Sequence, residues 1–229
     1  RDLHVRSRRQ RQMCIRDRLQ VTTNASSITQ YKKIMPLVNK FAMVKWNISI
    51  DGTGPVYEYV RTPSKWSRFK EAVDYLSTTE AGRLSTIISF NYCIQMWNYT
   101  NTPDVLKYCE DVEHSIHNRI VESNDGNIYT RPATTIKYGG VHMNTVSQPH
   151  LSIKLVNKSI KDDVLARARE IGINKTNYTN LKRVSTTTIH DAELVAKFRK
   201  HTKILDKVRN TDFATIDPTL MTHLRTVTH

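Results

Sequence analysis

Glycine is scarce in this sequence, and that scarcity narrows the possible folds more than any other feature. The chain of 229 residues contains seven glycines, about half of the ~7% usual in proteins. Folds that hold a dinucleotide or a phosphate on a glycine-rich loop need several glycines at fixed spacing. The sequence therefore argues against such folds, and we expect a chain dominated by helices.

Apolar residues recur at spacings of three and four in several segments, which predicts amphipathic helices. Thr62-Pro63 and Thr102-Pro103 each supply a capping hydroxyl followed by proline at the first helical position. Asp191 is suited to cap a last, long helix, and Gly172 ends the one before it. The predicted helices cover residues 63–76, 84–97, 102–120, 162–171 and 191–208.

Other segments lack this pattern. Residues 19–30 are polar and aperiodic, which predicts a linker. Residues 128–155 mix β-branched and aromatic residues with proline and glycine, which indicates loops or short strands. The predicted fold class is mainly α: a helical-bundle core of two helical groups joined by an irregular middle with possible short strands. Residues 31–229 are expected to form this domain.

The chain is strongly basic, with 35 Lys and Arg against 21 Asp and Glu and a net charge of +14. Such an excess favours a polyanionic partner, most simply nucleic acid. Most of it falls in residues 150–209, whereas residues 104–122 are acidic. The asymmetry also fits head-to-tail contact between copies of the chain, or a merely solvated helix face. The cations of the basic segment include Lys154, Lys158, Lys161, Arg167, Arg169, Lys182, Arg183, Lys197, Arg199, Lys200, Lys203, Lys207 and Arg209.

The first eighteen residues contain seven arginines and two aspartates. One interpretation is a basic arm that neutralises phosphates. The other is translated adapter DNA, because Met13–Asp17 back-translates to a sequence that resembles the transposon end used to tag sequencing libraries. Residues 1–30 are therefore expected to be a basic N-terminal segment, disordered or artefactual, and no site is assigned there.

Several classes of chemistry have no support in the sequence. No apolar run reaches the ~18 residues of a membrane helix, and the three cysteines without a Cys-x-x-Cys pair indicate a reducing compartment. Cys109, Glu110, Glu113, His114 and His117 share one predicted helix, but no further zinc ligands stand at recognisable spacing. No hydrolase or nucleotide-binding motif is present. We expect no enzymatic activity, no metal, no cofactor and no membrane association.

Two segments resemble a known family. Glu71-Ala72-Val73, Cys93-Ile94 and Asn101–Asp104 are similar to the two anchor motifs of flexuous filamentous plant-virus coat proteins of the potyvirus kind. Thr211–Asp217 resembles the F-A-A-F-D signature of the related potexvirus coats. The chain departs from the family pattern where the second anchor lacks its glycine and where residues 128–148 form a longer middle.

The resemblance implies a viral coat, or nucleocapsid, protein that polymerises helically around single-stranded RNA, located in the virion and the host cytoplasm. It implies that Thr102, Arg167 or Arg169, and Asp217 line the RNA groove, with Asp217 orienting the arginine. Arg167 and Arg169 are two residues apart on a helix and splay by about 200°, so only one of them can face a groove. Lys182 and Arg183 of the basic segment complete the predicted RNA-binding set.

Two other functions fit the same features. A cellular RNA-associated protein, for instance an organellar ribosome component, is also small, basic and poor in motifs. A fragment of a larger viral structural polyprotein is the second alternative. A neighbouring polymerase or helicase reading frame on the same transcript would indicate a virus, whereas introns or a transit-peptide start would indicate a cellular protein.

Overall fold

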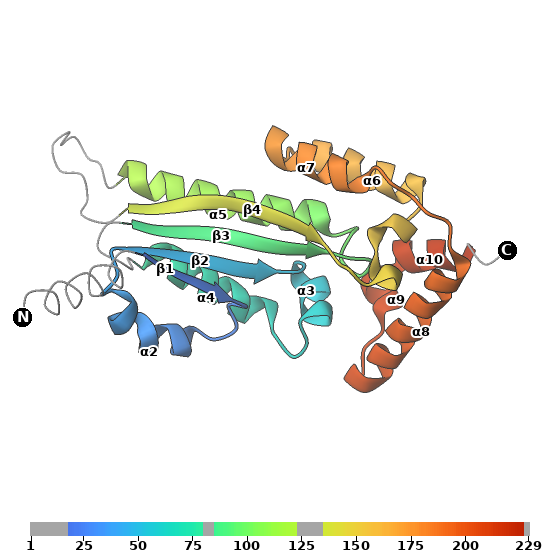
Figure 1. Cartoon of the computed structure of the whole chain (residues 1–229), viewed down its shortest axis with the longest axis horizontal. Coiled ribbons are helices and arrows are strands. Elements are labelled where there is room, and N and C mark those ends of the chain that lie inside the picture. The colour runs from blue at the N-terminus through green and yellow to red at the C-terminus, as the bar shows by residue number, and fades with distance from the viewer. Residues whose placement is uncertain (1–17, 80–84, 123–134, 227–229) are drawn as a thin grey trace, which may run out of the picture. The chain divides into compact units, whose positions relative to one another are not determined.

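The computed structural model describes residues 18–79, 85–122 and 135–226. These residues form four strands and nine α-helices (Figure 1). The strands are β1 (Arg18–Thr23), β2 (Met43–Ile50), β3 (Ser85–Ile94) and β4 (Thr135–Thr145). The helices are α2 (Ile28–Val38), α3 (Gly54–Val60), α4 (Trp66–Thr78), α5 (Thr102–Glu122), α6 (Lys158–Glu170), α7 (Lys175–Ser185), α8 (Ala192–Arg209), α9 (Phe213–Ile216) and α10 (Pro218–Thr226). Two single 3-10 turns, Pro149–Leu151 and Ile153–Leu155, follow β4.

The strands make one parallel sheet in the order β1-β2-β3-β4, so each strand pairs with its neighbour in the sequence. The register of the first pair places Arg18 opposite Met43 and Thr23 opposite Ile48. Helices occur in each connection, as parallel strands require a long crossover. The prediction of a mainly α helical bundle is therefore wrong, and the fold is α/β.

The largest error of the sequence prediction concerns β3, which occupies most of the helix predicted over residues 84–97. The residues at 87, 88, 91, 92 and 94 satisfy helical spacing, but Ile88, Phe90, Tyr92 and Ile94 also alternate and are fully buried. Inner strands of a parallel sheet are buried on both faces and read as continuous apolar runs, so their period is easily mistaken. The β-branched and aromatic residues of the segment favour the strand that is observed.

The predicted linker at residues 19–30 is wrong as well, because it forms β1 and the start of α2. The irregular middle contains an eleven-residue strand, β4, and residues 123–134 lie outside the described residues. Four of the predicted helices are confirmed as α4, α5, α6 and α8. The sequence prediction missed α2, α3, α7, α9 and α10.

The chain divides into two compact units. The first comprises Arg1–Ser49, Ser67–Phe90 and Asp111–Gly140, and the second comprises Ile50–Trp66, Asn91–Glu110 and Val141–His229. The strands β2, β3 and β4 begin in the first unit and end in the second. The candidate site lies in the second unit.

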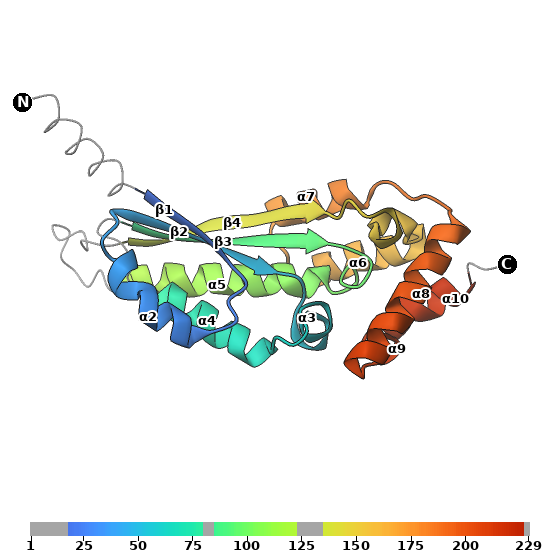
Figure 2. The same cartoon turned by 60° about the horizontal axis from the view of Figure 1, so that its bottom comes forward.

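In the first unit, α2, most of α4 and residues 111–122 of α5 lie on one face of the sheet (Figure 2). This follows from the strand order, because successive right-handed crossovers place their helices on the same side. Trp46 of β2 is fully buried there and meets the Tyr31 ring of α2 edge-on at 5.8 Å. Gly139 of β4 leaves no room for a side chain, since a Cβ at this position would lie 2.2 Å from Ser89 Oγ of β3.

In the second unit, the loops that follow β2 and β3 are held by polar side chains. Asp51 accepts a hydrogen bond from Arg61 Nε at 2.6 Å and another from the Cys93 backbone N–H at 3.3 Å. Asn98 donates through Nδ2 to the carbonyls of Asp51 and Cys93, both at 3.0 Å. These contacts fix the loops that lead into α3 and α5.

Candidate nucleic-acid interface

Helix α8 presents one buried face and one basic face. Its N-cap Asp191 accepts a hydrogen bond from the Leu194 backbone N–H at 2.9 Å. The helix is closed at its other end by the C-cap Asn210, whose backbone is left-handed with φ 53°. Such capping provides hydrogen-bond partners for terminal backbone groups that have none within the helix. The helix is therefore a well-defined rod of 18 residues.

The buried face of α8 packs against Trp97. The Phe198 ring lies 5.6 Å from the Trp97 ring, and Trp97 Nε1 donates to Thr202 Oγ1 at 2.9 Å. Val195, Phe198 and Thr202 are each at most 1% exposed. His201 also contacts the Trp97 ring, at 5.2 Å, and its Nδ1 lies 3.1 Å from Nε2 of His150.

The opposite face of α8 carries a hollow of about 470 Å³ that is bordered by cations. Its lining residues are Ala196, Arg199, Lys200, Lys203, Ile204 and Lys207. Within the described part of the chain, none of these four cations has an acidic partner within 4 Å. The described residues therefore leave the positive charge of this face uncompensated.

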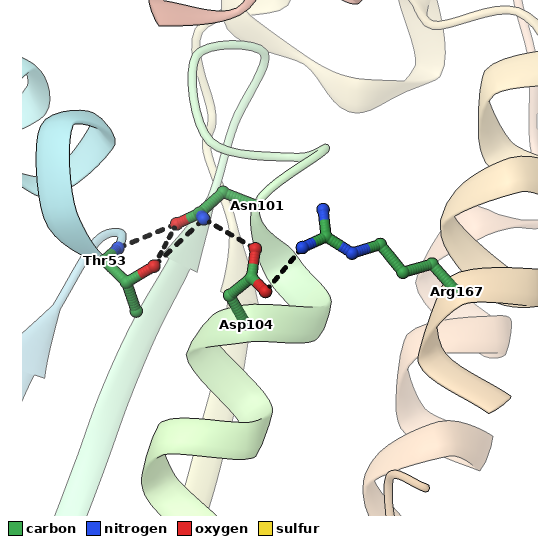
Figure 3. Close-up of polar contacts among 4 residues, drawn as sticks. All are labelled: Thr53, Asn101, Asp104 and Arg167. Atoms are coloured by element: carbon green, nitrogen blue, oxygen red, sulfur yellow. Dashed lines mark hydrogen bonds and ion pairs between the residues drawn. The ribbon is translucent and has the colours of Figure 1, made fainter. Parts of the chain in front are cut away.

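The predicted site residues on α6 are already engaged. Arg167 Nη2 donates to Asp104 Oδ1 at 2.7 Å, which makes an ion pair with the first turn of α5 (Figure 3). The Arg169 guanidinium lies over the Tyr178 ring at 5.1 Å. The two arginines thus point to different partners.

Asp217 does not pair with either arginine. One carboxylate oxygen accepts from the Thr100 hydroxyl, and the other accepts from the Leu220 backbone N–H at 2.9 Å. The orienting contact between Asp217 and an arginine, which the family resemblance implies, is not present. Asp217 and Arg167 do line the same pocket, together with Thr100.

Thr102 is fully buried at the start of α5. Its hydroxyl lies 2.9 Å from the hydroxyl of Tyr92, whose pKa is raised by burial. It has no exposed surface with which to contact RNA in this conformation. The remaining predicted cations, Lys182 and Arg183, are exposed in the last turn of α7.

The sequence identifies the basic segment but does not show which of its cations are paired within the protein. A helical projection of residues 191–209 places Arg199, Lys203 and Lys207 on one line, four residues apart. That spacing is a signal that distinguishes α8 from α6. The partners of Arg167 and Arg169 are not readable from spacing.

Two further properties bear on the site. Among the described residues, no helix is long and apolar enough to cross a membrane. No group of three or more His, Cys, Asp or Glu side chains capable of holding a metal ion occurs in residues 18–79, 85–122 and 135–226.

Comparison of the chain with family models, curated proteins and solved structures gave no match.

Proposed function

We propose that the protein binds single-stranded RNA through its phosphate backbone and that the basic face of α8 is the main contact. The observation that carries the proposal is the set of four cations around one hollow, none of which has an acidic partner among the described residues. Uncompensated cations on a protein surface attract polyanions and release their counterions on binding.

The arrangement of these cations favours a linear polyanion. Arg199, Lys203 and Lys207 follow one another at intervals of four residues, which is about 6 Å along a helix axis. The row therefore presents positive charges at regular intervals along the helix axis. It suits a chain of phosphates better than a single small anion.

The lining of the hollow also favours binding that is independent of sequence. Beside the cations, the only lining residues described are Ala196 and Ile204, so no aromatic ring is available there for base stacking. Contacts to phosphate carry no sequence information. We therefore expect similar affinities for single-stranded RNAs of different sequence.

The proposal is tested with the triple substitution Lys200→Gln, Lys203→Gln and Lys207→Gln in filter-binding titrations across salt concentration. Removing one phosphate contact lowers the slope of log affinity against log salt by about 0.7 for a single strand. The triple variant is expected to lower that slope by about 2 and to weaken binding to all RNA sequences alike.

The matched control is Lys33→Gln, Lys40→Gln and Lys70→Gln, which removes three exposed lysines of the first unit. It changes the net charge by the same amount and is expected to leave the slope near that of the original protein. If both triple variants weaken binding equally, the effect is one of net charge and α8 is not the site.

Assembly into a viral coat is the second part of the proposal, and the family resemblance of residues 62–105 and 211–217 supports it. Electron microscopy of the protein mixed with single-stranded RNA is expected to show rods or rings. Dispersed single particles that still bind RNA would contradict the coat role and favour a cellular RNA-associated protein.

A further inference from the structure

A second pocket in the same unit has a different chemistry from the α8 hollow. Its volume is about 290 Å³, at the lower end of the range for ligand sites, which suits a ligand smaller than a drug. It is lined by residues of α3, α5, α6, α9 and α10 and of the loops before α5 and α10: Val56, Thr100, Asn101, Asp104, Ile160, Asp163, Val164, Arg167, Ile216, Asp217, Pro218 and Thr219.

A chain of hydrogen bonds holds Arg167 at the wall of this pocket (Figure 3). The Thr53 backbone N–H donates to Asn101 Oδ1 at 2.7 Å, and Asn101 Nδ2 donates to Asp104 Oδ2 at 3.0 Å. Asp104 Oδ1 in turn accepts from Arg167 Nη2. This bond uses one of the five guanidinium N–H groups, and the described residues accept from none of the others. A guanidinium fixed in this way can receive a carboxylate.

Asp163 stands four residues before Arg167 on α6, so both side chains lie on the same face of the helix. Its carboxylate has no hydrogen bond and no ion pair with any residue that the structure describes. The Asp163 and Arg167 side chains therefore offer opposite charges to one pocket without neutralising each other.

The other two carboxylates of the pocket are occupied. Asp104 forms an ion pair with Arg167 and accepts a hydrogen bond from Asn101, and Asp217 accepts from Thr100 and from the Leu220 backbone N–H. Even so, three carboxylates and one guanidinium leave an excess of negative charge, which disfavours a simple anion. A ligand that enters with a carboxylate should also carry a cationic group.

The remaining lining is apolar. Val56, Ile160, Val164, Ile216 and Pro218 provide aliphatic surface on which a small hydrocarbon group can be buried. We propose that this pocket binds a free α-amino acid with an aliphatic side chain. Arg167 receives the carboxylate, Asp163 receives the ammonium, and the aliphatic residues receive the side chain.

The test is isothermal titration calorimetry of the full chain with leucine as the probe. Leucine is expected to bind with a dissociation constant on the order of 0.1 mM, given its small number of atoms. 4-Methylpentanoate lacks the ammonium and 3-methylbutylamine lacks the carboxylate. Each should bind at least about tenfold more weakly, because each makes only one of the two charged contacts that leucine makes.

Variants separate this site from general surface charge. Asp163→Asn is expected to weaken leucine binding at least about tenfold. Asp162→Asn removes the neighbouring carboxylate, which pairs with Lys158 and does not line the pocket, and should leave binding unchanged. Both positions are exposed, so both variants should fold, as circular dichroism can verify.

Three results would overturn the proposal. One is the absence of heat with leucine, valine and alanine alike. Another is equal affinity for leucine and 3-methylbutylamine, which would indicate a site for cations. The third is an equal effect of Asp163→Asn and Asp162→Asn. None of these results depends on RNA binding, which is tested separately with the substitutions on α8.

Discussion

Helices α6 and α8 are both amphipathic and both carry several Lys and Arg residues, yet these cations make different contacts. The arginines of α6 are bound within the molecule, to Asp104 and to the Tyr178 ring. The cations of α8 that surround the hollow have no acidic partner in the described structure. The α6 contacts organise the fold and leave only the remaining N–H groups of Arg167 for its pocket. The cations around the hollow on α8 are available to a polyanion.

The same contrast holds between the two faces of α8. One face is buried against Trp97 and holds the helix in place, whereas the other is exposed and includes Ile204, with 52% of its surface accessible. A substitution on the buried face can therefore weaken the packing on Trp97 without changing the basic face. A substitution on the basic face can likewise leave that packing intact.

The largest effect is expected for Phe198→Ala. Removing a buried aromatic side chain that packs on Trp97 should lower the free energy of unfolding by about 3–5 kcal/mol. Ile204→Ala, on the exposed face of the same helix, should change it by no more than about 0.5 kcal/mol. Urea denaturation measures both, and equal losses would contradict the assignment of the two faces.

The next effect concerns Lys161, a buried residue of α6 whose Nζ donates to the Thr187 carbonyl at 2.6 Å and to Thr188 Oγ1 at 3.0 Å. Burial lowers its pKa from 10.5 to about 8. Between these two values the unfolded chain binds more protons than the folded one, so Lys161 makes stability rise with pH, by at most about 3 kcal/mol.

Lys161→Met should remove this rise, which is measured as the difference in free energy of unfolding from the original protein at about pH 7.5 and pH 10. The control Lys158→Met lies one turn earlier and is highly exposed, so its difference should not depend on pH in this way. A parallel pH dependence in both variants would show that Lys161 keeps an ordinary pKa.

A third prediction compares the two helices directly in RNA binding. Lys203→Ala should lower the salt slope by about 0.7, the value for one phosphate contact. Arg167→Ala should leave the slope unchanged and lower the free energy of unfolding by less than about 1 kcal/mol, because its ion pair with Asp104 is solvent-exposed. The reverse result would place the RNA at α6, as the family resemblance implies.

The smallest effect is expected at His150. Burial, with contributions from Lys197 and His201, lowers its pKa below the usual 6.5. The unfolded chain then binds more protons as the pH falls below 6.5, so the stability that the neutral His150 supports is lost in that direction. His150→Gln should reduce the difference in melting temperature between about pH 7 and pH 5, and an unchanged difference would exclude His150 as its source.

The sequence is informative where caps and apolar stripes coincide. Asp191 and the stripe after it locate α8 to within a residue, and Thr102-Pro103 locates the start of α5. Glycine scarcity, by contrast, is a poor guide to the fold class. It excludes glycine-rich loops, but a parallel sheet does not need them, and here Asp51 and Asn98 hold the loops after β2 and β3.

The parts that could not be predicted depend on distant neighbours. β1 is too polar to be recognised as a strand, and only its pairing with β2 makes it one. The partner of Arg167 lies 63 residues away, so its ion pair leaves no trace in local spacing. The basic segment could thus be identified, whereas the division of its cations into engaged and available ones required the structure.

The order of the strands has a consequence for how the chain folds as it is synthesised. Each strand of the β1-β2-β3-β4 sheet pairs with the one made just before it, so no strand has to insert between two others. The sheet can grow at one edge while the ribosome is still adding residues, and contacts between strands remain short in sequence. Until β4 is complete, β3 presents an open edge with which another nascent chain can pair.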